Sequence, residues 1–209
     1  MNQPRNHSLQ LSDAESSLHA SAGEIILLTG HAGSGKTLWL KRLAGLIEPP
    51  AGTTVTLNGI ITKKTKQPIR MLFDRWPPVW LGQTVGEELL FGLGIQSEQQ
   101  DLEQTLSEWG LSELALTSGL ETLNRVQLLR LSLAAISLAR PAIALFDNPT
   151  SALAQEDAVT LSAEIARRSK QSDTIIVVAC NRWHDWRSCA SQIWRISSPD
   201  ALPQPRGQA

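Results

Sequence analysis

The stretch Gly30-His31-Ala32-Gly33-Ser34-Gly35-Lys36-Thr37 decides the fold. It follows the pattern G-x-x-x-x-G-K-[ST], in which the backbone N–H groups of a glycine-rich loop surround phosphate groups. The apolar run 24–29 before it is typical of a buried parallel strand, and the leucine-rich run 38–46 after it indicates a helix. Strand, loop and helix together aim N–H groups and a helix N-terminus at a polyphosphate. The motif therefore predicts a nucleotide-binding site.

Individual residues of this P-loop have distinct expected roles. Gly33 and Gly35 allow the backbone to approach the phosphates closely, Lys36 would reach the β- and γ-phosphates, and Thr37 would ligate Mg²⁺. We expect the nucleotide to be held by the whole motif, residues 30–37.

The composition restricts the kind of protein. With 209 residues the chain can bury one sizeable core, and its net charge of −1 gives no reason to expect a nucleic acid as partner. Two cysteines, Cys180 and Cys189, are too few for a disulfide framework and suit a reducing compartment. Residues 1–20 have no continuous apolar run, so we do not expect them to be a signal peptide, and no stretch approaches the ~20 apolar residues of a membrane span. We therefore expect a cytoplasmic protein that reaches a membrane only through a partner.

Strand-like and helix-like segments alternate along the chain. Residues 1–20 are polar, and one alternating piece within them, 8–11, suits the edge of a sheet. Runs at 53–57 and 60–61 flank Asn58-Gly59, a strong hairpin signal. Further strands are expected at 69–73, 143–147, 174–179 and 192–196, and helices at 124–139 and 156–170. This alternation predicts an α/β fold of the P-loop NTPase class, with a mostly parallel central sheet, flanking helices and a short antiparallel N-terminal hairpin.

A helical side lobe is expected at about 84–139. Thr84 with Glu87, and Ser97 with Gln100, have the spacing of capping boxes at helix starts. We place the nucleotide-binding domain at 21–198 and expect the Pro- and Gln-rich tail 199–209 to be disordered.

Six motifs follow one another in a characteristic order. They are Gly23-Glu24, the P-loop, Pro49…Gly52, Leu57-Asn58-Gly59, Thr84-Val85…Glu87-Glu88…Phe91-Gly92 and Asp147-x-Pro149-Thr150-Ser151-Ala152-Leu153. This order resembles the ATP-binding cassette (ABC) ATPase domain, and the match covers roughly residues 21–197. The segment 84–92 looks most like cassettes of cobalt, vitamin and general importers.

The resemblance implies ATP and Mg²⁺ as cofactors. Asp147 stands at the Walker B aspartate, which would hold Mg²⁺ together with Thr37. Asp74 stands at the family's Q-loop glutamine, where a carboxylate would lie near the phosphates and could help to hold Mg²⁺.

Two positions that the resemblance assigns to catalysis carry other residues. Asn148 stands where the family has a glutamate that polarises the attacking water, and an amide can hydrogen-bond a water but cannot accept its proton. Cys180 stands at the switch histidine, which hydrogen-bonds the γ-phosphate in the family. The chain therefore resembles a degenerate member with altered catalytic positions.

Positions that meet a second cassette in the family are altered as well. The signature LSGGQ aligns with Leu123-Asn124-Arg125-Val126-Gln127, so that Arg125 and Val126 replace its two glycines. The D-loop aspartate becomes Ala154, and with no tyrosine in the chain the adenine-stacking aromatic is not identifiable.

These observations predict an ATP- and Mg²⁺-binding cassette with weak or no hydrolysis. It would act as a nucleotide-dependent subunit or switch of a larger, transporter-like assembly. One alternative is a competent ATPase subunit that energises an ABC transporter. A second alternative is a P-loop small-molecule kinase, for which Arg125 and Arg130 would contact phosphate, although the segment 148–153 argues against it.

One loop is a candidate for contact with a protein partner. Trp76 and Trp80 flank Pro77-Pro78 and Val79, in the region where the family contacts its membrane subunit. Aromatic residues on a stiff loop are suitable docking anchors. We expect the partner to be a membrane subunit or a second cassette, so that a dimer is one of the expected forms.

Overall fold

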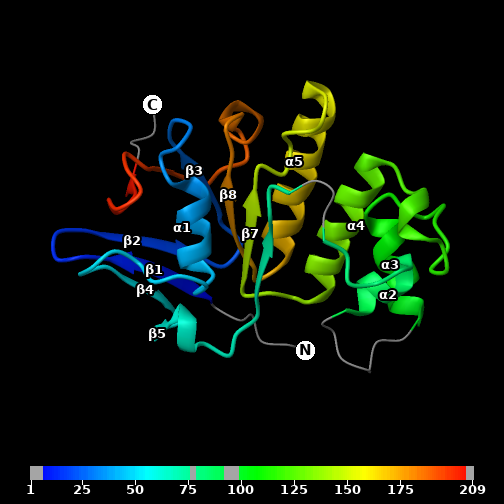
Figure 1. Cartoon of the computed structure of the whole chain (residues 1–209), viewed down its shortest axis with the longest axis horizontal. Coiled ribbons are helices and arrows are strands. Elements are labelled where there is room, and N and C mark those ends of the chain that lie inside the picture. Colours follow the sequence, from blue (N-terminus) through cyan, green and yellow to red (C-terminus); the bar gives the residue numbers. More distant parts are fainter. Residues whose placement is uncertain (1–6, 76–78, 92–98, 206–209) are drawn as a thin grey trace. The chain divides into compact units, whose positions relative to one another are not determined.

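The chain divides into two compact units. The computed structural model describes residues 7–75, 79–91 and 99–205 (Figure 1). Unit 1 combines Met1–Asp74 with Ala142–Ala209, and unit 2 is the intervening Arg75–Pro141.

A six-stranded sheet forms the centre of unit 1. Its strands, in spatial order, are β10 (Gln204–Pro205), β9 (Gln192–Arg195), β3 (Ile25–Thr29), β8 (Ile175–Ala179), β7 (Ile143–Asp147) and β6 (Ile69–Leu72). All neighbouring strands run parallel except β10, which is antiparallel to β9. The strands β3, β8 and β7 are buried at every position, as expected for parallel strands covered on both faces. The predicted mostly parallel central sheet is confirmed.

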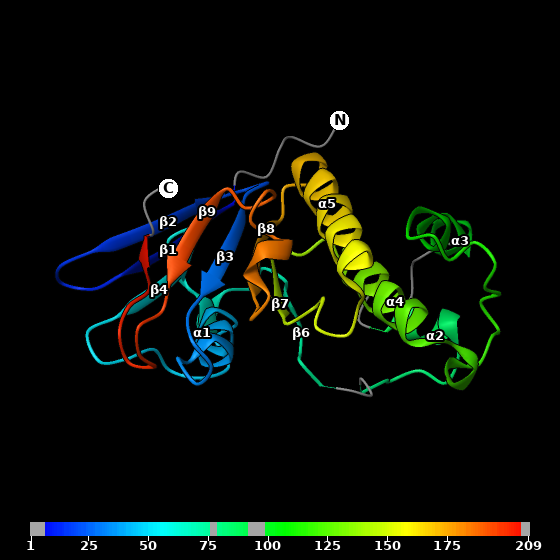
Figure 2. The ribbon, with the colours of Figure 1, turned by 90° about the horizontal axis from the view of Figure 1, so that it is seen from above.

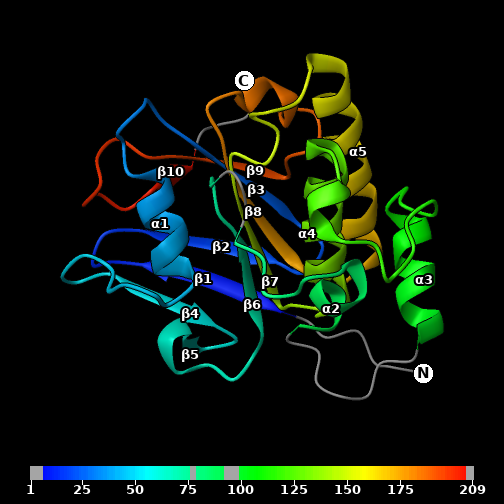
Figure 3. The same cartoon turned by 45° about the vertical axis from the view of Figure 1, so that its right-hand side comes forward.

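A smaller antiparallel sheet lies beside helix α1 (Lys36–Leu43). Its strands, in spatial order, are β2 (Ser17–Ser21), β1 (Ser8–Ser12), β4 (Thr54–Leu57) and β5 (Ile60–Ile61). Figures 1 and 3 show α1 next to β1, β2 and β4, and its Trp39, Leu40 and Leu43 share one buried core with apolar residues of both sheets. Helix α5 (Gln155–Gln171) covers the other face of the six-stranded sheet (Figure 2).

The N-terminal segment differs from the expectation of an edge strand. Residues 8–11 belong to β1, which lies inside the sheet because it pairs with β2 on one side and β4 on the other. Leu9 and Leu11 are fully buried, so the alternation that suggested an edge belongs to a strand with one face on the core. The hairpin at Asn58-Gly59 is confirmed by the antiparallel pairing of β4 with β5.

The expectation of a disordered tail was wrong for residues 199–205. β10 pairs with β9, Leu202 is buried, and the guanidinium of Arg42 donates a hydrogen bond to the carbonyl of Pro199. The low apolar content of the tail is offset by pairing with the edge of β9 and by the hydrogen bond from the buried Arg42, which lies 157 positions away in the sequence. Residues 206–209 lie outside the described part of the chain.

Unit 2 is helical. It contains α2 (Val85–Leu90), α3 (Gln99–Glu108) and α4 (Arg125–Leu138). The backbone N–H of Glu87 donates to the hydroxyl of Thr84, 3.2 Å, which caps α2 as predicted. Asn124 and Gln127 form a complete capping box at the start of α4, whereas the one expected at Ser97 lies outside the described residues.

Short 3₁₀ helices connect several of these elements. Those in the described residues are η1 (Thr62–Lys64), η2 (Leu120–Thr122) and η3 (Trp183–Asp185). Within the same residues, none of the helices has the length and apolar character needed to cross a membrane.

Candidate nucleotide-binding site

The P-loop joins the end of β3 to the start of α1, as the sequence predicts. Gly35 adopts φ 97°, and a Cβ added there would lie 2.8 Å from Cα of Pro199, so only glycine fits. A Cβ on Gly30 would lie 2.4 Å from the Ser34 hydroxyl. That hydroxyl is buried and has no hydrogen-bond partner among the described residues, which leaves one more group inside the loop for a ligand.

Lys36 folds over the P-loop. Its ammonium donates hydrogen bonds to the carbonyl oxygens of Gly30, 2.8 Å, and His31, 2.9 Å. Burial lowers the pKa of Lys36, which the negative charge of Asp147 partly opposes. A cation held over backbone N–H groups at a helix N-terminus fits a polyphosphate, because the anion supplies the countercharge that the site lacks.

Thr37 and Asp147 meet beside the P-loop. The hydroxyl of Thr37 donates to a carboxylate oxygen of Asp147, 2.7 Å, and Asp147 is only 3% exposed. Burial raises the pKa of Asp147 and the negative charge of Asp74 raises it further, whereas the bond from Thr37 lowers it. A hydroxyl next to a carboxylate supplies the oxygen ligands that Mg²⁺ prefers, so these two residues fit the predicted metal role.

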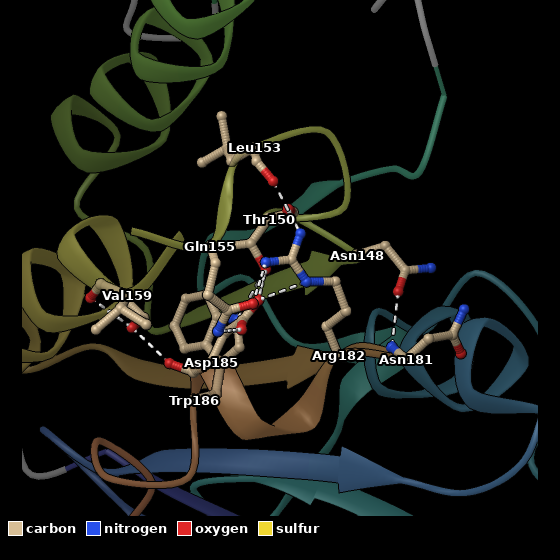
Figure 4. A network of polar contacts seen from close by, with 10 residues as sticks. Asn148, Thr150, Leu153, Gln155, Val159, Asn181, Arg182, Asp185 and Trp186 are labelled. Atoms are coloured by element: carbon tan, nitrogen blue, oxygen red, sulfur yellow. Dashed lines mark hydrogen bonds and ion pairs between the residues drawn. The ribbon is translucent and has the colours of Figure 1, made fainter. Parts of the chain in front are cut away.

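Asn148 connects the ends of three neighbouring strands. Its side-chain amide donates to Asp74 after β6, 2.8 Å, and its side-chain oxygen accepts from the backbone N–H of Asn181 after β8, 3.1 Å (Figure 4). Its own backbone N–H donates to the carbonyl of Ala179, 2.7 Å. Asn148 has φ 47°, a left-handed conformation that asparagine tolerates better than most residues. The structure thus brings the predicted residues Asp74, Asp147 and Asn148 together.

Cys180 lies directly after β8 and is 3% exposed. Burial raises the pKa of its thiol to about 12, although the positive charge of Lys36 opposes the shift. The thiol is therefore neutral at ordinary pH, and it offers only a weak donor where an imidazole would offer a strong one. A role in catalysis stays a prediction.

Arg182 joins the segment after β7 to the segment after β8. Its guanidinium donates to the carbonyl of Leu153, 2.8 Å, and to the side chain of Gln155, 2.9 Å (Figure 4). It also forms an ion pair with Asp185, 3.1 Å. Because these partners come from two separate loops, Arg182 fixes one loop against the other.

Asp185 is the buried centre of the same network. It is 2% exposed and accepts hydrogen bonds from Gln155, 2.8 Å, and from the hydroxyl of Thr150, 3.3 Å. The indole N–H of Trp186 donates to the Thr150 hydroxyl as well, 3.3 Å. The sequence did not predict this network. Arg182 and Asp185 are only three positions apart, but two opposite charges at that spacing are typical of a solvated surface, and their partners at 150–155 lie about 30 positions away.

The candidates in unit 2 have local structural roles. The guanidinium of Arg130 donates to the carbonyl of Trp109, 2.9 Å. Arg130 is one of the two arginines that the kinase alternative assigned to phosphate, and here it binds the backbone of its own unit. Val126 is exposed near the start of α4. Of the predicted docking loop, Trp76 and Pro77-Pro78 lie outside the described residues, whereas Val79 is exposed and Trp80 is half-buried.

Comparison with known proteins identifies relatives. The sequence model of a family described as ABC transporter matches residues 14–151. The energy-coupling factor transporter ATP-binding protein EcfA1 of Levilactobacillus brevis is 30% identical over 195 residues, which cover 89% of this chain and 68% of that protein. The cytochrome c biogenesis ATP-binding export protein CcmA of Pseudomonas putida is 29% identical, over 75% of this chain and 76% of that protein.

A solved structure shows the same fold. The chain of cbiO1 from Clostridium perfringens, described as part of the ABC transporter complex cbiONQ, superimposes with a TM-score of 0.79. The match covers 95% of this chain and 88% of that chain at 14% identity, so it supports the fold alone. This chain spans 56 to 68% of the length of the energy-coupling factor proteins that it matches.

Proposed function

This chain belongs to the ABC transporter family, and we propose that it is an ATP-binding subunit that hydrolyses ATP slowly or not at all. Residues 30–37 hold the phosphates, and Thr37 with Asp147 holds Mg²⁺, which when bound neutralises charge on the phosphates. The observation that carries the slow rate is Asn148. Its amide is committed to Asp74 and Asn181 and cannot accept a proton from water.

The residues of the site divide the work of binding. Lys36 exchanges its bonds to two loop carbonyls for bonds to phosphate oxygens, and the buried hydroxyl of Ser34 gains a partner. The hydroxyl of Thr37 and the carboxylate of Asp147, which are hydrogen-bonded to each other, would hold Mg²⁺ and so supply positive charge beside the phosphates. Binding therefore reorders contacts that already exist, and ATP acts as the switch that orders the chain for its partner.

We further propose that the protein works on a membrane through protein partners. Its relatives are named as ATP-binding proteins of transporters, and cbiO1 is described as part of a transporter complex. Val79 and Leu81, on either side of Trp80, are 63% and 60% exposed. Such apolar groups on one loop are suited to burial against another protein. A chain that reaches the membrane through a partner in this way would work on its cytoplasmic side.

Equilibrium binding and turnover on one purified sample test this function. A fluorescent ATP analogue should bind in the presence of Mg²⁺, and Lys36→Ala should weaken binding by about 100-fold, because a charge-assisted contact to phosphate is lost. Lys66→Ala, which removes an exposed lysine of the same unit, is the matched control.

The measured rate then separates the candidate functions. We expect turnover below about 0.1 s⁻¹, a tenth of the low end of ordinary enzyme rates. A faster native rate would favour the competent transport ATPase. Absence of binding in the native protein would reject nucleotide binding altogether.

A further inference from the structure

Asp74 and Asn148 form a carboxylate–amide pair beside the P-loop. The Nδ2 group of Asn148 donates to Oδ2 of Asp74, 2.8 Å, across the ends of β6 and β7. The resemblance to the ABC family places an amide at position 74 and a carboxylate at position 148, so this chain carries the two groups in exchanged places. We propose that Asp74 is the carboxylate that activates the attacking water, and that Asn148 is its positioning residue.

The position of Asp74 suits this role. It follows β6, whose parallel neighbour β7 ends in Asp147, so both carboxylates lie at the same edge of the sheet as the P-loop. Asp74 is exposed and can therefore receive a water molecule, whereas Asp147 is buried against Thr37. The negative charge of Asp74 acts on Asp147, in agreement with their closeness.

Asn148 is held firmly enough to orient its partner. Its side-chain oxygen accepts from Asn181 and its backbone N–H donates to Ala179, so the amide has one direction left for its Nδ2 group. That direction leads to Asp74. Figure 4 shows the bond at the other end of the amide, where the side-chain oxygen of Asn148 accepts from the backbone N–H of Asn181. The contact uses Oδ2 of the carboxylate, so Asn148 does not occupy Oδ1.

The chemical step follows from this arrangement. The oxygen of a water molecule forms a bond to the γ-phosphorus of ATP while the bond from that phosphorus to the bridging oxygen of ADP breaks. The proton of the water passes to the Asp74 carboxylate, which releases it to solvent after the phosphate has formed. An aspartate is one methylene shorter than a glutamate and starts from a different strand, which fits a slow reaction.

This inference rests on the proposed function, since it requires ATP at the P-loop. Its test uses substitutions of equal size in the full chain, namely Asp74→Asn, Asn148→Asp and the double exchange Asp74→Asn/Asn148→Asp. Asp157→Asn, an exposed carboxylate on α5, is the control. Each protein is measured for hydrolysis under single-turnover conditions, for thermal unfolding, and for binding of a fluorescent ATP analogue over a Mg²⁺ titration.

The single variants should lose different properties. Asp74→Asn should lower the hydrolysis rate by about 100-fold, the lower range of a general-base contribution, while the amide pair still forms a hydrogen bond. Asn148→Asp brings two carboxylates together and should lower the unfolding temperature. Its rate should also fall, because Asp74 loses its donor.

The double exchange separates structure from chemistry. The amide of residue 74 can donate to the carboxylate of residue 148, and that carboxylate can still accept from Asn181, so the unfolding temperature should return to that of the native chain. A native unfolding temperature in the double exchange would show that the hydrogen-bonded pair is intact in either orientation, so that a rate lost in Asp74→Asn is a loss of chemistry. A native rate equal to that of Asp74→Asn, including both at background, would overturn the inference.

The Mg²⁺ titration separates a water-activating from a metal-binding carboxylate. We expect Asp74→Asn to need the same Mg²⁺ concentration as the native chain for analogue binding, within about 3-fold. An increase above about 10-fold would make Asp74 a metal ligand and overturn the assignment. A native chain that fails to bind the analogue would instead contradict the proposed function, so the two failures are distinguishable.

Discussion

The thiol of Cys180 shows how a single buried side chain changes the chemistry of the site. Burial raises its pKa to about 12, and the nearby negative charge of Asp185 adds to that shift. The group is therefore uncharged over the whole physiological range. A site with a neutral thiol here loses the hydrogen bond and the switchable charge that an imidazole provides.

The pKa of Cys180 predicts how stability changes with pH. The folded pKa lies above the ordinary value of 9.0, so the unfolded chain loses this proton first as the pH rises. The contribution of Cys180 to the free energy of unfolding is therefore complete below pH 9 and declines as the pH approaches 12. We expect urea unfolding to show that the stability difference between the native chain and Cys180→Ala shrinks from pH 8 to about pH 11.

Two comparisons make that measurement specific. Lys36 has a lowered pKa and titrates with the opposite sign, and it is present in both proteins. Cys189→Ala removes the half-buried cysteine and provides the control. A stability difference that is constant over the same pH range would show that Cys180 does not titrate between the folded and unfolded states.

At the scale of elements, two loops behave as one. The segments 148–154 and 180–186 are joined by the guanidinium of Arg182 and by the buried carboxylate of Asp185 (Figure 4). Asn148 and Asn181 close the same connection at its other end. A ligand that displaces one segment would act on the other through these contacts, which is a connection that a nucleotide switch can use.

Arg182→Ala should destabilise the chain strongly. It leaves the carboxylate of Asp185, whose side chain is 1% exposed, without its cation. Breaking a fully buried pair costs about 3–5 kcal/mol, and the loss here should be smaller because the Arg182 side chain is 35% exposed. Chemical unfolding measures this loss. Arg182→Ala combined with Asp185→Asn should recover part of it, because the uncompensated charge is removed. Equal stability of Arg182→Ala and the native chain would mean that the network carries no structural load.

Local sequence signals were sufficient to predict most helices and strands. Contacts between residues far apart in the sequence could not be predicted from them. The turn at Asn58-Gly59 and the capping residue Asn124 act on neighbours a few residues away, so their patterns can be read directly from the sequence. The contact of Arg42 with Pro199 spans 157 positions, and that of Asp74 with Asn148 spans 74. Such pairs depend on which strands become neighbours, which local propensity does not determine.

At the scale of the whole molecule, the chain has surface suited to a partner. It spans 56 to 68% of the length of its energy-coupling factor relatives, and apolar side chains at 79 and 81 are exposed in unit 2. Exposed apolar groups of this kind contribute to binding when they become buried in a partner.

Trp80→Ala and Leu81→Ala should each reduce recovery of the partner. Loss of a buried aromatic or leucine anchor costs about 1–3 kcal/mol in an interface, which corresponds to a roughly 5- to 150-fold weaker complex. Co-purification of the tagged full chain from its native membranes measures the effect. Leu46→Ala, an exposed leucine of unit 1, serves as the control. Undiminished recovery with both variants would exclude this loop as the docking site.

The contact between Pro199 and Gly35 also bears on the order in which the protein matures. Ribosomes make the P-loop early, but the segment that packs against it, held by Arg42 through Pro199 and Asp200, is made more than 150 residues later. For most of its synthesis, a nascent chain therefore carries the P-loop without the Pro199–Asp200 segment that packs against it. ATP, which is abundant around the ribosome, would meet a fully formed loop only once this late segment has emerged and docked.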